Sequence, residues 1–180
     1  MRYRFLSVKA KQLLSGSAFL LLAAVAFSGC YKEPEFPVEP SIEFDEISKQ
    51  VRIDQFSGAN KDSVVISIKF RDGDGDLGMN NEEIAIAQEN QDYNYIVRVF
   101  RKRRGQFVEF NPFIPYSGFF FRLKNDDKVG PIEGTLSYSI DFPHPFTPKR
   151  DSVQFLVSLK DRAGNVSNVV ETETIVLNEF

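Results

Sequence analysis

The chain has 180 residues, a formal net charge of −3, a single cysteine and no tryptophan. One cysteine cannot form an intramolecular disulfide, so an apolar core must stabilise the fold. The acidic balance excludes a protein that binds nucleic acid mainly through positive charge.

Residues 1–29 have the pattern of an export signal. Four basic residues and no acid occur in residues 1–11, and an apolar run follows over residues 13–27. A run of about 15 residues is short for a membrane span, which needs roughly 20. The run ends in Phe27-Ser28-Gly29-Cys30, which resembles the lipobox of bacterial lipoproteins. The resemblance implies that Cys30 is lipidated and becomes the new N-terminus; the alternative is an ordinary cysteine behind a conventional signal.

Residues 31–40 contain three prolines and three glutamates, a composition that predicts a flexible tether. Acidic residues directly after the cysteine are similar to the surface-export signal of lipoproteins in Bacteroidota, but a solvated linker explains them equally well. We therefore expect a signal peptide at 1–29, a lipidated cysteine and tether at 30–40, and a single domain at 41–180. Removal of the signal leaves 18 basic and 25 acidic residues, a charge of −7.

From residue 41 onward, apolar residues alternate with polar ones, which is typical of β-strands. Residues 101–105 are predicted to be a solvated hairpin tip, and residues 81–88 fit either a helical turn or a strand. Seven or eight strands without a clear amphipathic helix predict an all-β fold, an antiparallel immunoglobulin-like or fibronectin III-like sandwich. The predicted strands begin at 42–44 and continue with 64–70, 93–100, 107–110, 136–142, 153–159 and 168–177.

Three aspartates, Asp72, Asp74 and Asp76, alternate with glycines directly after the strand predicted at 64–70. Alternate carboxylates in a tight loop suit calcium, which takes six to eight oxygen ligands. Glu83 follows at the twelfth position, as in the calcium loop of EF-hands. Leu77 stands at the sixth position, where that family has glycine, and a strand precedes the loop instead of a helix. We therefore reject an EF-hand and predict a calcium-type loop in a β context, against the alternative of a solvated acidic turn.

Residues 62–77 and 151–166 can be aligned without a gap. Each segment begins with Asp-Ser-Val, continues as an alternating strand and ends in a polar glycine loop. If the two strands are the central strands of facing sheets, both loops emerge at the same end of the sandwich. Asp161 and Asn165 are then additional candidate ligands. This expectation requires residues 119–123 to be an edge excursion and not a full crossing strand.

Five aromatic residues, Phe113, Tyr116, Phe119, Phe120 and Phe121, crowd into nine positions. Consecutive residues of a strand cannot all face the same side, so at least one of the last three should be exposed and could contact a partner. The other interpretation is that alternate residues of this aromatic stretch simply face the core. The absence of tryptophan favours a protein partner over a glycan.

Catalysis is not expected. His144 is the only histidine, and it lies in an apparently exposed loop between two prolines without an evident partner. Cys30 offers no free thiol once it is lipidated.

The loop at 160–167 contains Asp161-Arg162-Ala163-Gly164-Asn165, which resembles a turn of bacterial immunoglobulin-like surface modules. Together with the acidic loop and the lipobox, it resembles a group of Bacteroidota lipoproteins of unassigned function. The resemblance implies an outer-membrane lipoprotein, facing the periplasm or the surface, but no activity. We expect a non-enzymatic interaction module or accessory subunit, stabilised by calcium and bound to another envelope protein. The alternative is a lipoprotein that binds a glycan or another nutrient.

Overall fold

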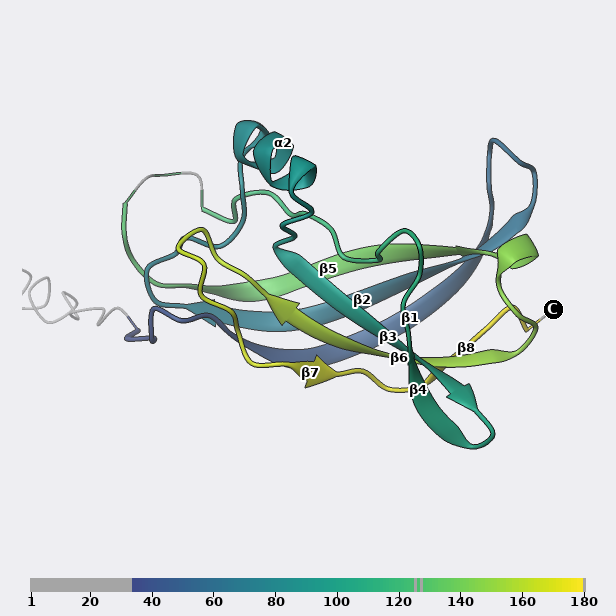
Figure 1. The fold of residues 1–180 in the computed structure, drawn as a ribbon. Helices are drawn as coiled ribbons and strands as arrows, with labels where there is room; N and C mark the ends of the chain where they lie inside the picture. Colours follow the sequence, from purple (N-terminus) through teal and green to yellow (C-terminus); the bar gives the residue numbers. More distant parts are fainter. Residues whose placement is uncertain (1–33, 125, 127, 180) are drawn as a thin grey trace, which may run out of the picture. The chain divides into compact units, whose positions relative to one another are not determined.

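The protein forms two facing antiparallel sheets, seen in a computed structural model that describes residues 34–124, 126 and 128–179 (Figure 1). Both sheets belong to the unit Glu35–Phe180. The predicted all-β sandwich is therefore confirmed.

The first sheet has three long strands, β1 (Ser41–Ile53), β2 (Asn60–Asp72) and β5 (Ile132–Pro143). Their order is β1-β2-β5, and each pairing is antiparallel. β2 is the central strand, and the side chains of Val64, Ile66 and Ile68 point from it into the core. A long alternating strand flanked on both sides is the expected centre of one layer.

The second sheet is built around β3 (Tyr95–Arg103) and β6 (Asp151–Leu159). β4 (Gln106–Phe110) extends it beyond β3, whereas the short strands β7 (Val170–Glu171) and β8 (Ile175–Leu177) pair with β6. The two sheets thus correspond to strands A-B-E and C′-C-F-G of an immunoglobulin-type sandwich. β2 and β6 occupy the positions of strands B and F.

The strand predicted over residues 168–177 is interrupted. β7 and β8 pair with different parts of β6, and Thr172 lies between them. The Thr172 hydroxyl accepts a hydrogen bond from the Phe155 N–H at 3.1 Å, and the Thr172 N–H donates to the Phe155 carbonyl at 2.9 Å. A threonine side chain therefore replaces one ladder bond at the break.

The prediction that residues 101–105 form a solvated tip was wrong for Arg101. β3 continues to Arg103, and the Arg101 side chain points inward and is only 8% exposed. Its Nε lies 3.1 Å from Oδ2 of buried Asp151, and its guanidinium lies 3.7 Å from the centroid of the Phe110 ring. Because Asp151 supplies the opposite charge at the start of β6, an arginine can occupy a core-facing position. The turn itself needs only Arg104 and Gly105, which both have positive φ.

Residues 81–89 form the one α-helix of the described residues, α2 (Asn81–Glu89). A capping box starts it: the Glu83 N–H donates to the Asn80 side chain at 2.8 Å, and the Asn80 N–H donates to the Glu83 carboxylate at 2.7 Å. These two bonds satisfy backbone groups that a helix N-terminus leaves without partners. Of the two interpretations of this segment, the helical one is correct.

Candidate metal site

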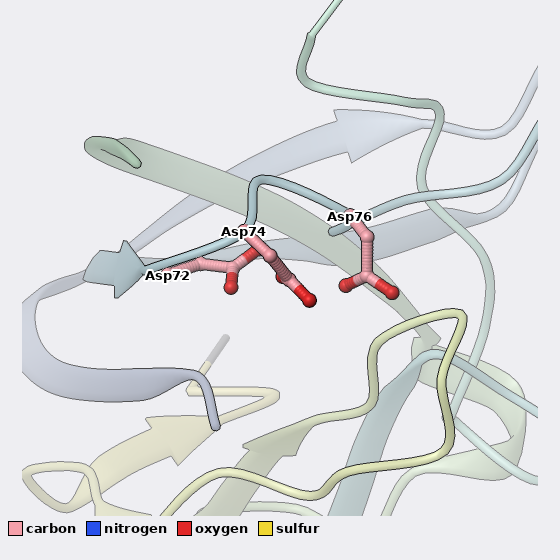
Figure 2. A group of neighbouring side chains, drawn as sticks. All are labelled: Asp72, Asp74 and Asp76. Atoms are coloured by element: carbon pink, nitrogen blue, oxygen red, sulfur yellow. The ribbon is translucent and has the colours of Figure 1, made fainter. Parts of the chain in front are cut away.

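Three carboxylates gather at the end of β2. Asp72 is the last residue of that strand, and Asp74 and Asp76 follow in the acidic loop, which comprises residues 72–78. One oxygen from each side chain lies within 4.8 Å of the others, and Figure 2 shows all three carboxylates on the same side of the loop. These three residues could hold a metal ion.

Burial makes this cluster different from a solvated acidic turn. Asp72 is 0% exposed, and its Oδ2 accepts the Leu77 N–H at 3.2 Å. The buried Oδ1 atoms of Asp72, Asp74 and Asp76 have no hydrogen-bond partner in the part of the chain that the structure describes. Buried carboxylate oxygens normally have a partner. Three buried oxygens without a partner, on side chains close enough to share an ion, are an arrangement that a cation would satisfy.

The electrostatics of the cluster disfavour its charged form. The pKa of Asp72 is raised to about 6, first because burial removes water and then because the Asp74 carboxyl group lies beside it. Burial also raises the pKa of Asp76, with further contributions from the negative charges of Asp161 and Asp74. A bound cation would reverse both effects, since it favours the ionised form of each carboxylate.

Each glycine of the acidic loop is a place of close backbone approach. A Cβ atom at Gly73 would lie 2.3 Å from the Phe36 carbonyl oxygen, and one at Gly75 would lie 2.4 Å from the Gly130 carbonyl oxygen. At Gly78 the corresponding distance, to the Phe121 carbonyl oxygen, is 2.3 Å. Three segments remote in sequence therefore enclose the loop. Gly75 and Gly78 also have positive φ, which side-chain-bearing residues rarely adopt.

The loop that follows β6 lies against the acidic loop, as the repeat predicted. The Ala163 N–H donates to Oδ2 of Asp76 at 3.0 Å, and Arg162 Nη1 donates to the Gly78 carbonyl at 3.0 Å. The condition for this contact also holds, because residues 119–123 make only an isolated bridge, from Phe121 to Met79, instead of a full strand.

The three remaining candidate ligands already have partners. Glu83 caps α2, and its carboxylate binds Arg122 at 2.6 Å, which is the main reason why the pKa of Glu83 is lowered. Asp161 accepts the Asn165 backbone N–H at 2.7 Å and the Asn165 side-chain amide at 2.8 Å. The group of three carboxylates close enough to share an ion consists of Asp72, Asp74 and Asp76. Ligation by Glu83, Asp161 or Asn165 stays a prediction.

An open cavity of about 120 Å³ adjoins the carboxylates and is lined in part by Asp74, Asp76, Lys128 and Arg162. It is a path from solvent to Asp74 and Asp76; Asp72 does not line it. A metal site needs such a path as well as its ligands.

No protein-family model matches the chain, and no curated protein or solved structure is significantly similar to it.

The aromatic stretch is divided between core and surface. Phe120 is buried, Tyr116 packs on the core with its ring centroid 4.8 Å from that of Phe142, and Phe119 lies 5.2 Å from the Tyr93 ring. Phe113 is fully exposed and Phe121 is 64% exposed. The expectation that one of the three consecutive phenylalanines is exposed is confirmed, but the five residues do not form one aromatic surface.

His144 does not lie in an exposed loop, although the flanking prolines suggested one. It begins the 3₁₀ helix η1 (His144–Phe146), and its side chain is only 12% exposed. Its Nε2 lies 3.2 Å from Oδ1 of buried Asp62, whose Oδ2 accepts the Asn178 N–H at 2.6 Å. The histidine therefore helps to join the start of β2 to the C-terminal end of the domain.

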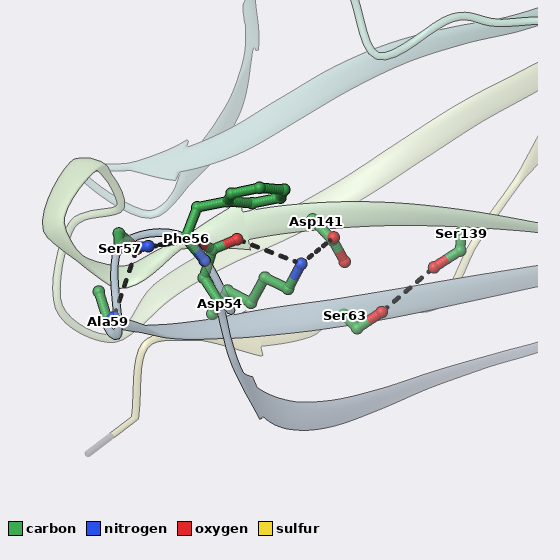
Figure 3. Close-up of polar contacts among 8 residues, drawn as sticks. Asp54, Phe56, Ser57, Ala59, Ser63, Ser139 and Asp141 are labelled. Atoms are coloured by element: carbon green, nitrogen blue, oxygen red, sulfur yellow. Dashed lines mark hydrogen bonds and ion pairs between the residues drawn. The ribbon is translucent and has the colours of Figure 1, made fainter.

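Phe56 is an exposed aromatic residue that the sequence reasoning missed. It is fully exposed in the turn between β1 and β2, and Figure 3 shows Asp54 as the centre of that turn. Oδ1 of Asp54 accepts the Phe56 N–H at 3.2 Å, the Ser57 N–H at 2.9 Å and the Ser57 hydroxyl at 2.9 Å. Asp-x-x-Ser is a turn-forming pattern, so it could have indicated a rigid turn that presents Phe56.

Cys30, the predicted lipidation site, lies outside the described residues. Within the described residues, no helix has the length and apolar character needed to cross a bilayer.

The raised pKa of Asp72 predicts the pH dependence of the metal-free protein. Between about pH 4 and about pH 6 the folded state binds more protons at Asp72 than the unfolded state does, so stability falls as the pH rises through this range. We expect a loss on the order of 2 kcal/mol from this residue. Urea unfolding in the presence of a chelator, compared between the wild type and Asp72→Asn, measures it. The prediction is wrong if the two proteins show the same pH dependence; Glu82→Gln, at an exposed position, is the control.

Proposed function

We propose that this protein is a lipid-anchored, non-enzymatic β-sandwich of the Gram-negative outer membrane, facing the periplasm or the surface. It acts as an interaction module or accessory subunit for another envelope protein. A calcium ion at Asp72, Asp74 and Asp76 stabilises the end of the domain where β2 and β6 finish. The observation that carries the ion is the fully buried Asp72 carboxylate, whose Oδ1 has no partner among the described residues.

Calcium fits this donor set better than the other common metals. The three candidate donors are carboxylate oxygens, which hard cations prefer, whereas zinc and copper favour histidine and cysteine. Calcium also tolerates irregular geometry and takes backbone carbonyls and waters as further ligands. Magnesium demands a nearly ideal octahedron and gives up its waters reluctantly.

The interaction role is supported by aromatic side chains that remain on the surface. Phe56 is held outward by a rigid turn, and Phe113 and Phe121 are exposed on the segment that follows β4. Exposed aromatic residues are common anchors of protein interfaces. A glycan platform would need several of these aromatic rings exposed side by side, but Tyr116 and Phe120 pack into the core. We therefore favour a protein partner.

Calcium binding can be measured by calorimetric titration of the protein after chelation. We expect a dissociation constant of about 0.1 to 1 mM, the range of extracellular calcium modules, and stabilisation of the fold as calcium is added. Asp74→Ala should weaken binding at least about tenfold, because one of the three carboxylates is lost. Glu82→Ala removes the same charge from an exposed position on α2 and should leave binding unchanged. Absence of binding at millimolar calcium would exclude the site.

Partner binding should depend on the exposed aromatic residues. After cross-linking in intact envelopes, Phe56→Ser or Phe113→Ser should reduce the recovery of the co-purified envelope protein about tenfold. Ile86→Ser changes an apolar residue that is also exposed, on α2, and serves as the matched control. Equal recovery with all three variants would contradict the proposed interface.

The lipid anchor predicts a change in location. Cys30→Ser removes the acylated sulfur and should move the protein from the membrane fraction to the soluble fraction, because the anchor supplies the membrane affinity. Lys32→Ser, two positions away, should leave the protein in the membrane fraction. An unchanged distribution of Cys30→Ser would refute the anchor.

A further inference from the structure

The acidic loop contacts the segment through which the chain enters the domain. The Gly73 N–H donates to the Pro37 carbonyl at 2.9 Å. A Cβ atom at Gly73 would lie 2.3 Å from the Phe36 carbonyl oxygen and 2.5 Å from that of Pro37. Gly73 stands between Asp72 and Asp74, so the entering backbone packs directly on the candidate ion site.

This contact differs from the other two close approaches to the loop. Gly75 and Gly78 are met by the Gly130 and Phe121 carbonyls, and both of these residues lie within the domain. Phe36 and Pro37 instead belong to residues 31–40, the segment predicted to connect Cys30 to the sandwich. Pro37 and the buried Pro40 have fixed φ angles, which restrict the backbone conformations open to this part of the segment.

We infer that ion binding by the acidic loop and docking of residues 35–37 on Gly73 are coupled, so that the ion holds this entering segment against the loop. The inference rests on the proposed calcium site and lipid anchor. It assigns the ion a role beyond stabilisation of the acidic loop, the ordering of the segment that connects Cys30 to the sandwich at residues 35–37.

The coupling follows from the position of Gly73. The bond to Pro37 holds the peptide between Asp72 and Asp74, and therefore holds the spacing of two candidate ligands. An ion held by Asp72 and Asp74 would in turn fix the peptide of Gly73, whose N–H is the donor to Pro37. Coupling between two binding events is reciprocal, so a docked segment strengthens ion binding by the same factor by which the ion strengthens docking.

Gly73→Ala separates these events. The φ angle of Gly73 is not in the left-handed region, so alanine is allowed by the backbone, yet its Cβ forces residues 36 and 37 away. All three aspartates remain. We expect calcium affinity to fall at least about fivefold, the lower end of typical coupling. Gly58→Ala strains a positive-φ glycine in the β1–β2 turn with no atom nearby, so it controls for general destabilisation.

Docking can be followed by limited proteolysis after Glu35 in the protein purified from membranes in detergent. Calcium should slow this cleavage in the wild type and in Gly58→Ala, but not in Gly73→Ala. Cleavage after Glu173, exposed between β7 and β8, corrects for global unfolding. If the wild type binds calcium but cleavage after Glu35 is the same with and without it, the coupling is refuted and the calcium site stands. If the wild type does not bind calcium, the proposed function itself fails.

Discussion

One constraint governs the end of the sandwich where β2 and β6 finish: the Asp72 carboxylate is buried, and one of its oxygens has no partner among the described residues. Asp72 is completely enclosed, and its nearest charged neighbours in the loop have the same sign. Burial of an ionised group is costly unless an opposite charge or hydrogen bonds offset it. One oxygen of the Asp72 carboxylate is satisfied, because it accepts the Leu77 N–H. The other oxygen requires a proton or a cation.

The three carboxylates cannot lower the cost of burying their charges by moving apart, because backbone from three other segments encloses the loop. The close approaches at Gly73, Gly75 and Gly78 leave no room for side chains. Leu77, where an EF-hand has glycine, is fully buried and anchors the loop in the core. The approaches at Gly75 and Gly78 and the burial of Leu77 hold the loop in shape independently of the docking of residues 35–37. A site organised in advance loses less entropy on binding, which partly offsets the small number of carboxylate ligands.

Sequence patterns predicted the strands and the meeting of the two loops because these follow from periodicity and strand direction. The alternation in β2 and β6 located both central strands, and their parallel direction brought Asp76 beside Ala163. Patterns failed where a polar residue has a specific partner remote in sequence. Arg101 looked solvated because its counter-charge, Asp151, is 50 positions away. The contact of Pro37 with the acidic loop left no signal either, since a proline-rich segment looks the same whether it is docked or free.

The repeat contains four buried aspartates, and only one of them lacks a complete set of partners within the described residues. Each central strand has one buried aspartate at or near its start and another at or just beyond its end: Asp62 and Asp72 for β2, Asp151 and Asp161 for β6. Three of the four have partners within the protein: Asp62 has His144, Asp151 has Arg101, and Asp161 has Asn165. Of these four aspartates, Asp72 alone has an oxygen with neither a hydrogen bond nor a basic neighbour. The second loop contributes the Ala163 N–H to Oδ2 of Asp76, and this bond leaves Oδ1 of Asp76 available to any ion that Asp72 and Asp76 would share.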